Sequence, residues 1–359
     1  MTTMTDDDTD LRALRELADD IFSASTQPVL DVQQTGLPFD GNLWGNLVES
    51  GLALLTTPEE RGGTGAGLAE LAVVLESAGF HAAPAPVAEH DLLASWLLEL
   101  ANLPSENAVL TASTTAEGLH GARLNCVLNR VPWAADAEAI VIAGDGFVAV
   151  VPRDDVTIDP NVDIAGQPAN RVTVDVTPAQ LQTLDISPTA EFAFRGGWAR
   201  AVQTCGALSR ALSLACEHAR DRQQFGRPIA KFQAVQALLS QAAGSLSMAK
   251  TAAEFSTGVV AAHGFNSAAG RFAVSVAKIE SARAATVVSR NAHQVHGAIG
   301  FTLDHRLRHF TTRALAWRSE FGSQREWQYR LGQMVADHPG SAWEAVTAFS
   351  STVAIPITN

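Results

Sequence analysis

The pattern of hydrophobic and polar positions divides the chain into three parts, and the first part is helical. Apolar residues recur at intervals of three and four in "LRALRELADDIF", "NLWGNLVESGLALL" and "LAELAVVLESAGF", which places them on one face of an α-helix. The turn-rich loop "TTPEERGGTGAG" precedes the third segment, and the proline-broken connection "HAAPAPVAEH" follows it. We predict an N-terminal helical domain over residues 1–105.

The middle part has a different period. Short β-branched runs, separated by Gly, Asp and Pro, follow one another as "LNCVLNRVPWA", "AIVIAG", "GFVAVV" and "RVTVDV". Runs of this length between turn residues are typical of antiparallel strands. We predict a middle antiparallel β-barrel domain over residues 106–191.

Long, alanine-rich helical patterns return in the last part. The segments that begin "WARAVQTCGAL", "QAVQALLSQAA" and "AVSVAKIESAR" each continue the helical period over many turns, and "REWQYRLGQMVADH" adds a fourth. Small residues at their seams allow the helices to pack closely. We predict a C-terminal four-helix bundle over residues 192–359, and an α+β multi-domain fold for the whole chain.

Composition and charge narrow the classes of partner. The net charge of -13 argues against nucleic acid or an anionic membrane surface, and the first residues, "MTTMTDDDTD", are unlike a signal peptide. Cys126, Cys205 and Cys216 have neither the spacing of a metal site nor that of a disulfide framework. We therefore expect a cytoplasmic protein with no nucleic-acid or membrane partner.

Two stretches carry candidate chemistry. In "ARDRQQFGRPIAKFQAVQALL", Arg220, Arg222 and Arg227 gather around the helix break at Pro228. A guanidinium suits phosphate oxygens, but arginines near a helix end also complement the helix dipole, and spacing alone favours that second interpretation.

In the second stretch, "NAHQVHGAIGFTLDHRLRHF", a long helix stops at Gly297 and Gly300 follows. Glycines let the backbone approach a ligand and free its N–H groups for an anion, and Gln294 offers an amide contact. The alternative is that Gly297 is only a helix C-cap.

Histidine pairs and a glycine-rich loop give weaker signals. His293 with His296, and His305 with His309, have spacings that suit a metal on a helix face, but no carboxylate or cysteine completes either site. We therefore predict no metal. "GGTGAG" lacks the strand, loop and helix context of a dinucleotide-binding loop.

Taken together and in this order, these stretches resemble the acyl-CoA dehydrogenase family over nearly the whole chain. "LVESGLALLTTPEERGGTGAGLAELAVVLESAG" is similar to the family's N-terminal stretch with its Pro-Glu-Glu-x-Gly-Gly-x-Gly loop. "RDRQQFGRPIAKFQAVQ" resembles Arg-x-x-Phe-Gly-x-x-Ile-x-x-Phe-Gln. "QVHGAIGFTLDHRLRHFTTRA" resembles Gln-x-x-Gly-Gly-x-Gly-Phe, with Arg313 near the usual Arg-Asp position.

The resemblance implies a flavoprotein that removes the α-proton and β-hydride of an acyl-CoA, giving a trans-2-enoyl-CoA, and passes electrons to an acceptor. It also implies an FAD shared at a subunit interface. Arg222 would contact the pyrophosphate of the FAD held mainly by a neighbouring subunit, and Phe225 and Gln233 would line its adenosine. Gln294 and Gly297 would complete this group, which we call the FAD clamp.

Departures from the family lie around the flavin ring. Members carry a Thr-Glu-Pro-x-Ala-Gly-Ser-Asp loop and a Trp-x-Thr-Asn strand, whereas this chain reads "VLTASTTAEGLHGARLNCVLN". Only Leu110, Thr111 and Ala112 are reminiscent of the loop, and the strand after it has no tryptophan. Ala298 replaces the second glycine of the clamp.

The catalytic base is the other departure. Members place a glutamate in a Tyr-Glu-Gly-Thr loop or on an earlier bundle helix. Matching "SEFGSQRE" to the loop puts Phe321 at the glutamate and Glu320 one residue before it, and the helix alternative falls near Arg283, with Glu280 almost a turn away. A base must come within about 3 Å of its proton, so this slip matters.

Glu320 is thus the candidate catalytic residue, and the alternative for it is an ion pair with Arg318 or Arg325. Three hypotheses follow. The chain is the non-catalytic subunit of a heteromeric (α2β2) acyl-CoA dehydrogenase, of a kind that in this family often acts on sterol-type acyl-CoAs. Otherwise it is a self-sufficient homo-oligomer with Glu320 as base, or a non-redox binding or assembly protein of the same fold. The sequence favours the first.

Overall fold

The N-terminal part of the chain is helical, as predicted. The computed structural model describes residues 6–104 and 108–350. Leu43, Leu47, Leu71 and Leu75, which the apolar period placed on the inner helix faces, are fully buried. The elements are α1 (Asp6–Thr26), α2 (Gly41–Glu49), η1 (Glu59–Arg61), α3 (Leu68–Phe80), η2 (Ala88–Ser95) and α4 (Trp96–Leu100).

The prediction of a connection over "HAAPAPVAEH" is wrong for its last three residues. The π-helix η2 begins there, at Ala88. All eight residues of η2 are buried, including Glu89, His90 and Asp91. A buried helix could not be predicted here from the sequence, because it contains three consecutive ionisable residues. Such residues are buried only when they have partners, and these partners lie elsewhere in the chain.

The middle part forms two four-stranded sheets. One has the strand order β1-β4-β5-β8 and the other the order β2-β3-β7-β6. The strands predicted from β-branched runs appear as β3, β4, β5 and β7. The bounds are β1 (Leu110–Thr114), β2 (Leu119–His120), β3 (Arg123–Pro132), β4 (Ala139–Gly144), β5 (Phe147–Pro152), β6 (Thr157–Asp159), β7 (Ala169–Val176) and β8 (Gln180–Thr183).

The two sheets share one apolar core, with Cys126, Leu128, Ile142 and Val172 among its buried residues. Where an antiparallel barrel was expected, the pairs are antiparallel except β1 with β4, which run parallel. The reason is that β2 and β3 leave for the second sheet before the chain returns beside β1. A parallel neighbour requires such a crossover.

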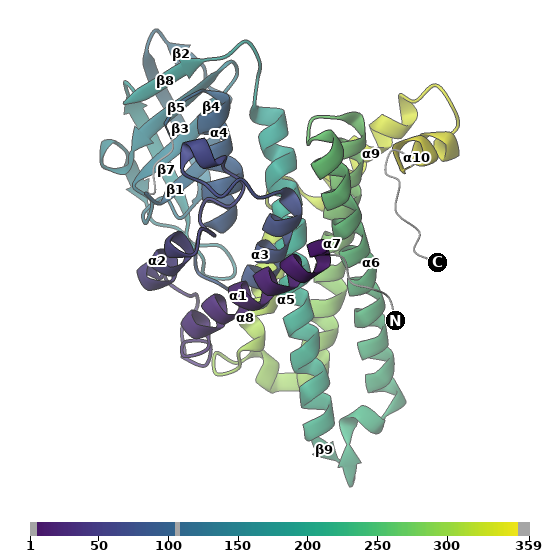
Figure 1. Ribbon diagram of the computed structural model, residues 1–359. Helices are drawn as coiled ribbons and strands as arrows, with labels where there is room; N and C mark the ends of the chain where they lie inside the picture. The colour runs from purple at the N-terminus through teal and green to yellow at the C-terminus, as the bar shows by residue number, and fades with distance from the viewer. Residues whose placement is uncertain (1–5, 105–107, 351–359) are drawn as a thin grey trace.

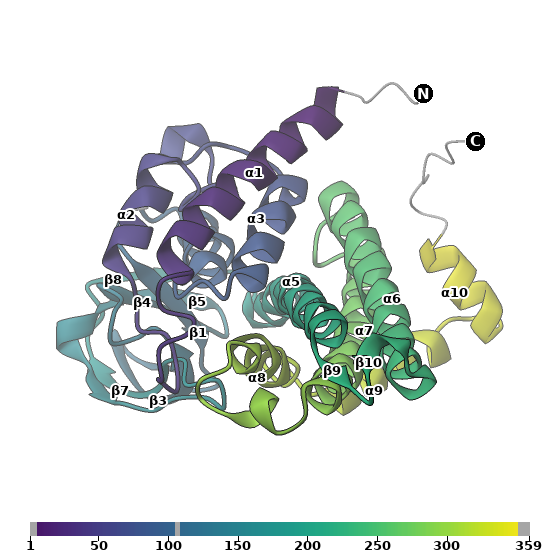
Figure 2. The ribbon, with the colours of Figure 1, turned by 90° about the horizontal axis from the view of Figure 1, so that it is seen from below.

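The C-terminal part is built on three long helices, which Figures 1 and 2 show side by side. In Figure 2, α5 lies between the N-terminal helices and the pair α6 and α7. The predicted fold class is confirmed, while the exact domain boundaries remain a prediction. The helices are α5 (Thr189–Asp221), α6 (Gln233–His263), α7 (Ala268–His296), α8 (Leu307–Trp317), α9 (Gln324–Ala336) and α10 (Ala342–Ser350), with the short η5 (Gly297–Phe301) after α7.

The helices α3 and α5 cross with their backbones in contact. A Cβ atom added at Gly79 would lie 2.1 Å from the carbonyl oxygen of Gln203, and one added at Gly206 would lie 1.9 Å from that of Glu76. Neither glycine can therefore carry a side chain without separating the helices. This crossing fixes the N-terminal helices against the bundle.

Among the helices of the described residues, none is both long and apolar enough to cross a membrane.

Candidate functional site

The stretch with the Phe-Gly-Arg-Pro break folds as a tight hairpin between α5 and α6. Its strands are β9 (Gln223–Gln224) and β10 (Arg227–Pro228). The two turn residues, Phe225 and Gly226, have φ of 53° and 78°, which is the geometry of a type I′ turn, usually occupied by Asn-Gly. Phe225 is 91% exposed in this unfavourable conformation. A bulky residue at positive φ is strained, so a turn that keeps one at its tip points to a role outside the chain.

Residues far apart in the sequence bring the FAD clamp together at one end of the bundle. The rings of His218, near the end of α5, and His296, at the end of α7, stack with centroids 4.6 Å apart. Arg222 and Gly297 directly follow these helix ends. The structure therefore places both predicted motifs at the same end of the molecule.

All five clamp residues are exposed, and their chemistry fits an adenosine pyrophosphate. In the part of the chain that is described, the Arg222 guanidinium forms no ion pair, so it keeps its donors for a phosphate. Gln233 begins α6 and Gln294 lies in the last turn of α7, both facing solvent. An arginine, two amides and an exposed aromatic ring at the same end of the bundle can contact both halves of such a ligand.

Gly297 serves as the helix end and leaves room for a ligand at the same time. Its φ is 67°, and its N–H donates to the His293 carbonyl at the end of α7. A Cβ atom at this position would meet nothing within 4 Å. The C-cap interpretation is thus correct, and the open space above Gly297 is compatible with a close approach of a ligand.

Beside the clamp, Gln294 also lines a cavity of about 900 Å³ between α7, α8 and the loop before β7. Arg290 and Arg308 lie in its wall, and Phe301 stacks on His293 at its edge with centroids 4.5 Å apart. The clamp is therefore continuous with a larger open surface.

Glu320 lies in a different environment from the clamp, because it is held by a buried arginine. Nε of Arg200 on α5 donates to Oε2 of Glu320 at 2.7 Å. Only 6% of the Arg200 side chain and 18% of the Glu320 side chain are exposed. The ion-pair alternative predicted for Glu320 is therefore realised, with Arg200 as the partner rather than Arg318 or Arg325.

Arg200 is saturated by further acceptors. Its two terminal nitrogens donate to Oε1 of Gln203, at 2.6 Å, and to a carboxylate oxygen of Glu89 on η2. Burial alone would lower the pKa of Arg200, but the carboxylates of Glu320 and Glu89 outweigh it and hold that pKa above its ordinary value. The guanidinium therefore stays charged, and each of its three nitrogens donates a hydrogen bond.

A buried lysine supports the turn that carries Glu320. Nζ of Lys278 on α7 donates to the Trp317 carbonyl at 2.5 Å, and the side chain is almost fully buried. Burial lowers the pKa of Lys278 to about 7, while the nearby Glu320 carboxylate acts in the opposite direction. The lysine caps the C-terminal end of α8 and so fixes the start of the turn.

Phe321, at the position that matches the family's loop glutamate, packs into the protein core. A Cβ atom added at Gly196 of α5 would lie 2.3 Å from the Phe321 ring, so the ring rests directly on that glycine. Its centroid lies 5.9 Å from that of Phe192. The helix alternative fares no better, because Glu280 pairs with Arg283 at 2.9 Å.

The pocket in front of Glu320 is lined by residues of the middle part and of the C-terminal part of the chain. A cavity of about 410 Å³ is bounded by β1, by the end of β3, by α5 and by the turn after α8. Strand β3 contains no tryptophan. Trp133 follows it directly, but is buried with its ring 6.2 Å from that of Phe39. The family's tryptophan contact is thus absent from strand β3.

Sequence reasoning missed Arg200, Glu89 and Lys278. Arg200 and Lys278 interrupt the apolar face of their helices, which is the one signal that could have drawn attention to them, because a charge on such a face needs a buried partner. Within the described residues no group of three or more His, Cys, Asp or Glu side chains is arranged to hold a metal ion.

Comparison with known proteins identifies relatives of this arrangement. Residues 8–107 match the model of the acyl-CoA dehydrogenase N-terminal domain, and residues 195–330 match that of the C-terminal domain. Acyl-CoA dehydrogenase IpdE2 of Mycolicibacterium smegmatis is 31% identical over 86% of this chain and 92% of its own length.

Two solved assemblies have the same fold. A chain of the ChsE4-ChsE5 complex from Mycobacterium tuberculosis superposes with a TM-score of 0.82 at 24% identity, covering 95% of this chain and 100% of its own. A chain of a Tcur3481-Tcur3483 steroid ACAD variant gives a TM-score of 0.79 at 25% identity, covering 92% and 98%. The first likeness shows the fold alone.

Proposed function

The chain belongs to the acyl-CoA dehydrogenase family, and from this premise we propose that it is the non-catalytic subunit of a heteromeric enzyme that desaturates an acyl-CoA. FAD is the cofactor of the family. In this proposal the chain supplies the FAD clamp to a homologous subunit, and that subunit supplies the catalytic glutamate.

The observation that carries the proposal is the state of Glu320. A general base must release its carboxylate to the substrate proton, but Glu320 is bonded to Arg200. Freeing it would leave a buried guanidinium short of a partner, which costs on the order of 3–5 kcal/mol when such a pair is broken. Phe321 and Glu280 offer no replacement.

The clamp supports the other half of the proposal. FAD would supply the hydride acceptor, and Arg222 would neutralise its pyrophosphate. Phe225 would cover the adenosine at the hairpin tip, and the space above Gly297 would admit the cofactor backbone. The Phe225 ring lies edge-on to Phe232 but is 91% exposed. Among the described residues Arg222 forms no ion pair. Both side chains can therefore contact a cofactor that is bound mainly by another subunit.

The relatives support the heteromeric form and the substrate class. ChsE4-ChsE5 and Tcur3481-Tcur3483 are each named as pairs of proteins, and the second is named as a steroid ACAD. We propose by analogy a bulky, alicyclic acyl-CoA as substrate, with an electron-transfer acceptor to reoxidise the flavin.

The experiment that tests this proposal is the flavin spectrum of the chain purified alone and then with its homologous partner. We expect a colourless lone chain, and a yellow complex with one FAD for each pair of chains. Glu320→Gln should leave turnover of the complex within about twofold, because an amide still accepts from Arg200.

Other outcomes would favour the two competing functions. A lone chain that is yellow, is bleached by acyl-CoA and loses this bleaching in Glu320→Gln would establish a homo-oligomer with Glu320 as base. A complex that stays colourless would favour a non-redox assembly protein.

A further inference from the structure

A third cavity lies between four helices and has no part in the proposed clamp. Its volume is about 320 Å³, and α1, α3, α5 and α6 each contribute to its wall. Most of the lining is small and apolar, with Ala72, Val73, Val202, Ala253 and Gly258 as examples.

This cavity and Glu320 are on different faces of α5. Each residue of an α-helix turns the side chain by about 100°. Val202 and Cys205, which line the cavity, therefore point about 160° and 140° away from Arg200, the partner of Glu320. The backbone contact of α3 with α5 at Gly79 and Gly206 closes the space between the two helices. The cavity is a separate compartment.

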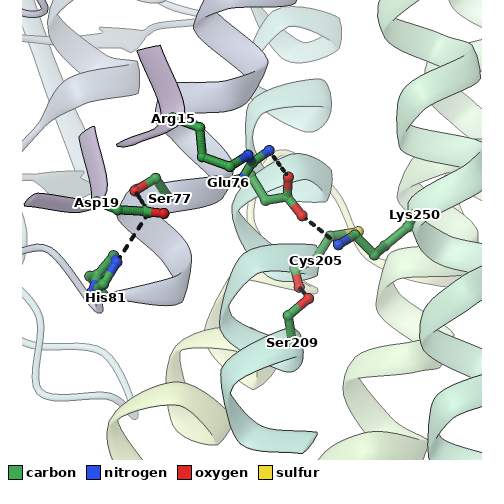
Figure 3. Close-up of polar contacts among 8 residues, drawn as sticks. All are labelled: Arg15, Asp19, Glu76, Ser77, His81, Cys205, Ser209 and Lys250. Atoms are coloured by element: carbon green, nitrogen blue, oxygen red, sulfur yellow. Dashed lines mark hydrogen bonds and ion pairs between the residues drawn. The ribbon is translucent and has the colours of Figure 1, made fainter. Parts of the chain in front are cut away.

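Charged residues lie at the mouth of the cavity and an uncharged thiol lies at its floor. The side chains of Arg15 and Lys250 are 41% and 38% exposed, whereas Cys205 is 2% exposed. Figure 3 shows Glu76 between the two cations, with Cys205 next to them. Glu76 accepts from Arg15 at 2.6 Å and pairs with Lys250 at 2.8 Å, which ties α1, α3 and α6 together across the opening.

These bonds disfavour an anionic ligand. Although burial acts in the opposite direction, Lys250 and Arg15 hold the pKa of Glu76 below its usual value, so Glu76 remains ionised. An anionic ligand would have to displace Glu76 from both cations and leave its carboxylate without a partner. Burial raises the pKa of Cys205 to about 12, so the floor carries a neutral thiol and no nucleophile.

The size of the cavity sets the size of a ligand. A dry apolar cavity of about 150 Å³ binds one benzene molecule, and this one has about twice that volume. A Cβ atom at Gly258 would meet nothing within 4 Å, so the space beside α6 is open. We propose that this cavity binds a small, neutral, apolar molecule of about two fused aliphatic rings, independently of the FAD clamp.

The test is calorimetric titration of the full-length chain with 2-decalone, a neutral bicyclic ketone. We expect a Kd of roughly 0.1–1 mM, the range for a ligand of this size without charge. Gly258→Leu places a side chain in the cavity and should weaken binding at least about tenfold. Gly244→Leu is the matched control, because Gly244 is on the same helix, is equally open and does not line the cavity. It should change the Kd by less than about twofold.

Three results would overturn the proposal. They are the absence of any binding heat, equal affinity in Gly258→Leu and the unchanged chain, and tighter binding of decalin-2-carboxylate than of 2-decalone. Circular dichroism of both leucine variants is the control that tests whether they fold. Titration of FAD into the complex with the partner subunit should give the same affinity for Gly258→Leu, so this inference and the proposed function fail separately.

Discussion

The helix α5 carries two groups of functional residues that differ in how their bonding capacity is used. Arg222 at its C-terminal end is exposed and forms no ion pair among the described residues, whereas Arg200, about 33 Å upstream at 1.5 Å per residue, donates to three side chains. An arginine whose three nitrogens all donate to side chains of the same chain stabilises the fold. An arginine whose donors face solvent can bind a ligand. This difference is the one that the proposed function requires, in which the chain binds the cofactor and its partner supplies the base.

Arg200→Met should have the largest effect, because it removes the saturated side of this comparison. Glu89 and Glu320 would remain buried without their cation, so the free energy of unfolding should fall by about 3–5 kcal/mol. Urea denaturation of the chain measures this. The double variant Arg200→Met/Glu320→Gln should recover part of the lost unfolding free energy. A loss below about 1 kcal/mol in Arg200→Met alone would show that Arg200 does not hold the two carboxylates.

Arg222→Ala should affect binding and not stability. A charge-assisted hydrogen bond contributes about 1.5–3 kcal/mol, so FAD affinity of the assembled complex should fall about tenfold to a hundredfold. Urea denaturation of the lone chain should be unchanged. Arg220→Ala is the control, since Arg220 is equally near the helix end but donates to the Cys216 carbonyl. Equal losses of affinity in the two variants would refute the assignment of Arg222.

The pH dependence of stability should expose Lys278. Between about pH 7 and 10.5 its amine is protonated in the unfolded chain and deprotonated in the folded chain. The unfolded state then binds more protons, and the free energy of unfolding rises with pH. From pH 7 to 8.5, the free energy of unfolding of the unchanged chain should rise relative to that of Lys278→Met, by at most about 1.4 kcal/mol per pH unit. A constant difference between the two chains would show that Lys278 stays protonated.

Phe225→Asn should have the smallest effect, with opposite signs in the two assays. Asn-Gly suits the positive φ of both turn residues, so stability should rise by up to about 1 kcal/mol. Loss of the aromatic ring should weaken FAD binding in the complex about threefold to tenfold. Thermal unfolding and FAD titration measure the two effects. If stability and FAD affinity both rise or both fall, Phe225 is not a strained residue that serves FAD binding.

The two regions also differ in how far the sequence predicts them. The position of the clamp could be predicted from the sequence because each of its parts is a local feature. These parts are a helix break, a Phe-Gly turn and a glycine at a helix end. The helices and four of the strands were predictable for the same reason, since their periods are local. The FAD clamp assignment itself still rests on the family resemblance.

The hydrogen-bonded network around Arg200 could not be predicted from the sequence, because it joins residues that are distant in the sequence. Arg200 is 111 residues from Glu89 and 120 from Glu320. Glu89 lies in a segment whose prolines and polar residues suggest a connection, and only its partners make a buried π-helix stable there. The parallel pairing of β1 with β4 was missed on similar grounds, because the order of strands in a sheet is a property of the tertiary fold.

The contact of Phe321 with Gly196 has an evolutionary consequence. Phe321 has a φ of 56°, and its ring fills the space left by the missing side chain of Gly196. Replacing Phe321 with glutamate would leave a void over the glycine and bring a third carboxylate close to Arg200, so the substitution would lower stability. A lineage that reached this arrangement would need several coordinated substitutions to leave it. If the proposed function is correct, this turn makes a return to a self-sufficient enzyme improbable by any single substitution.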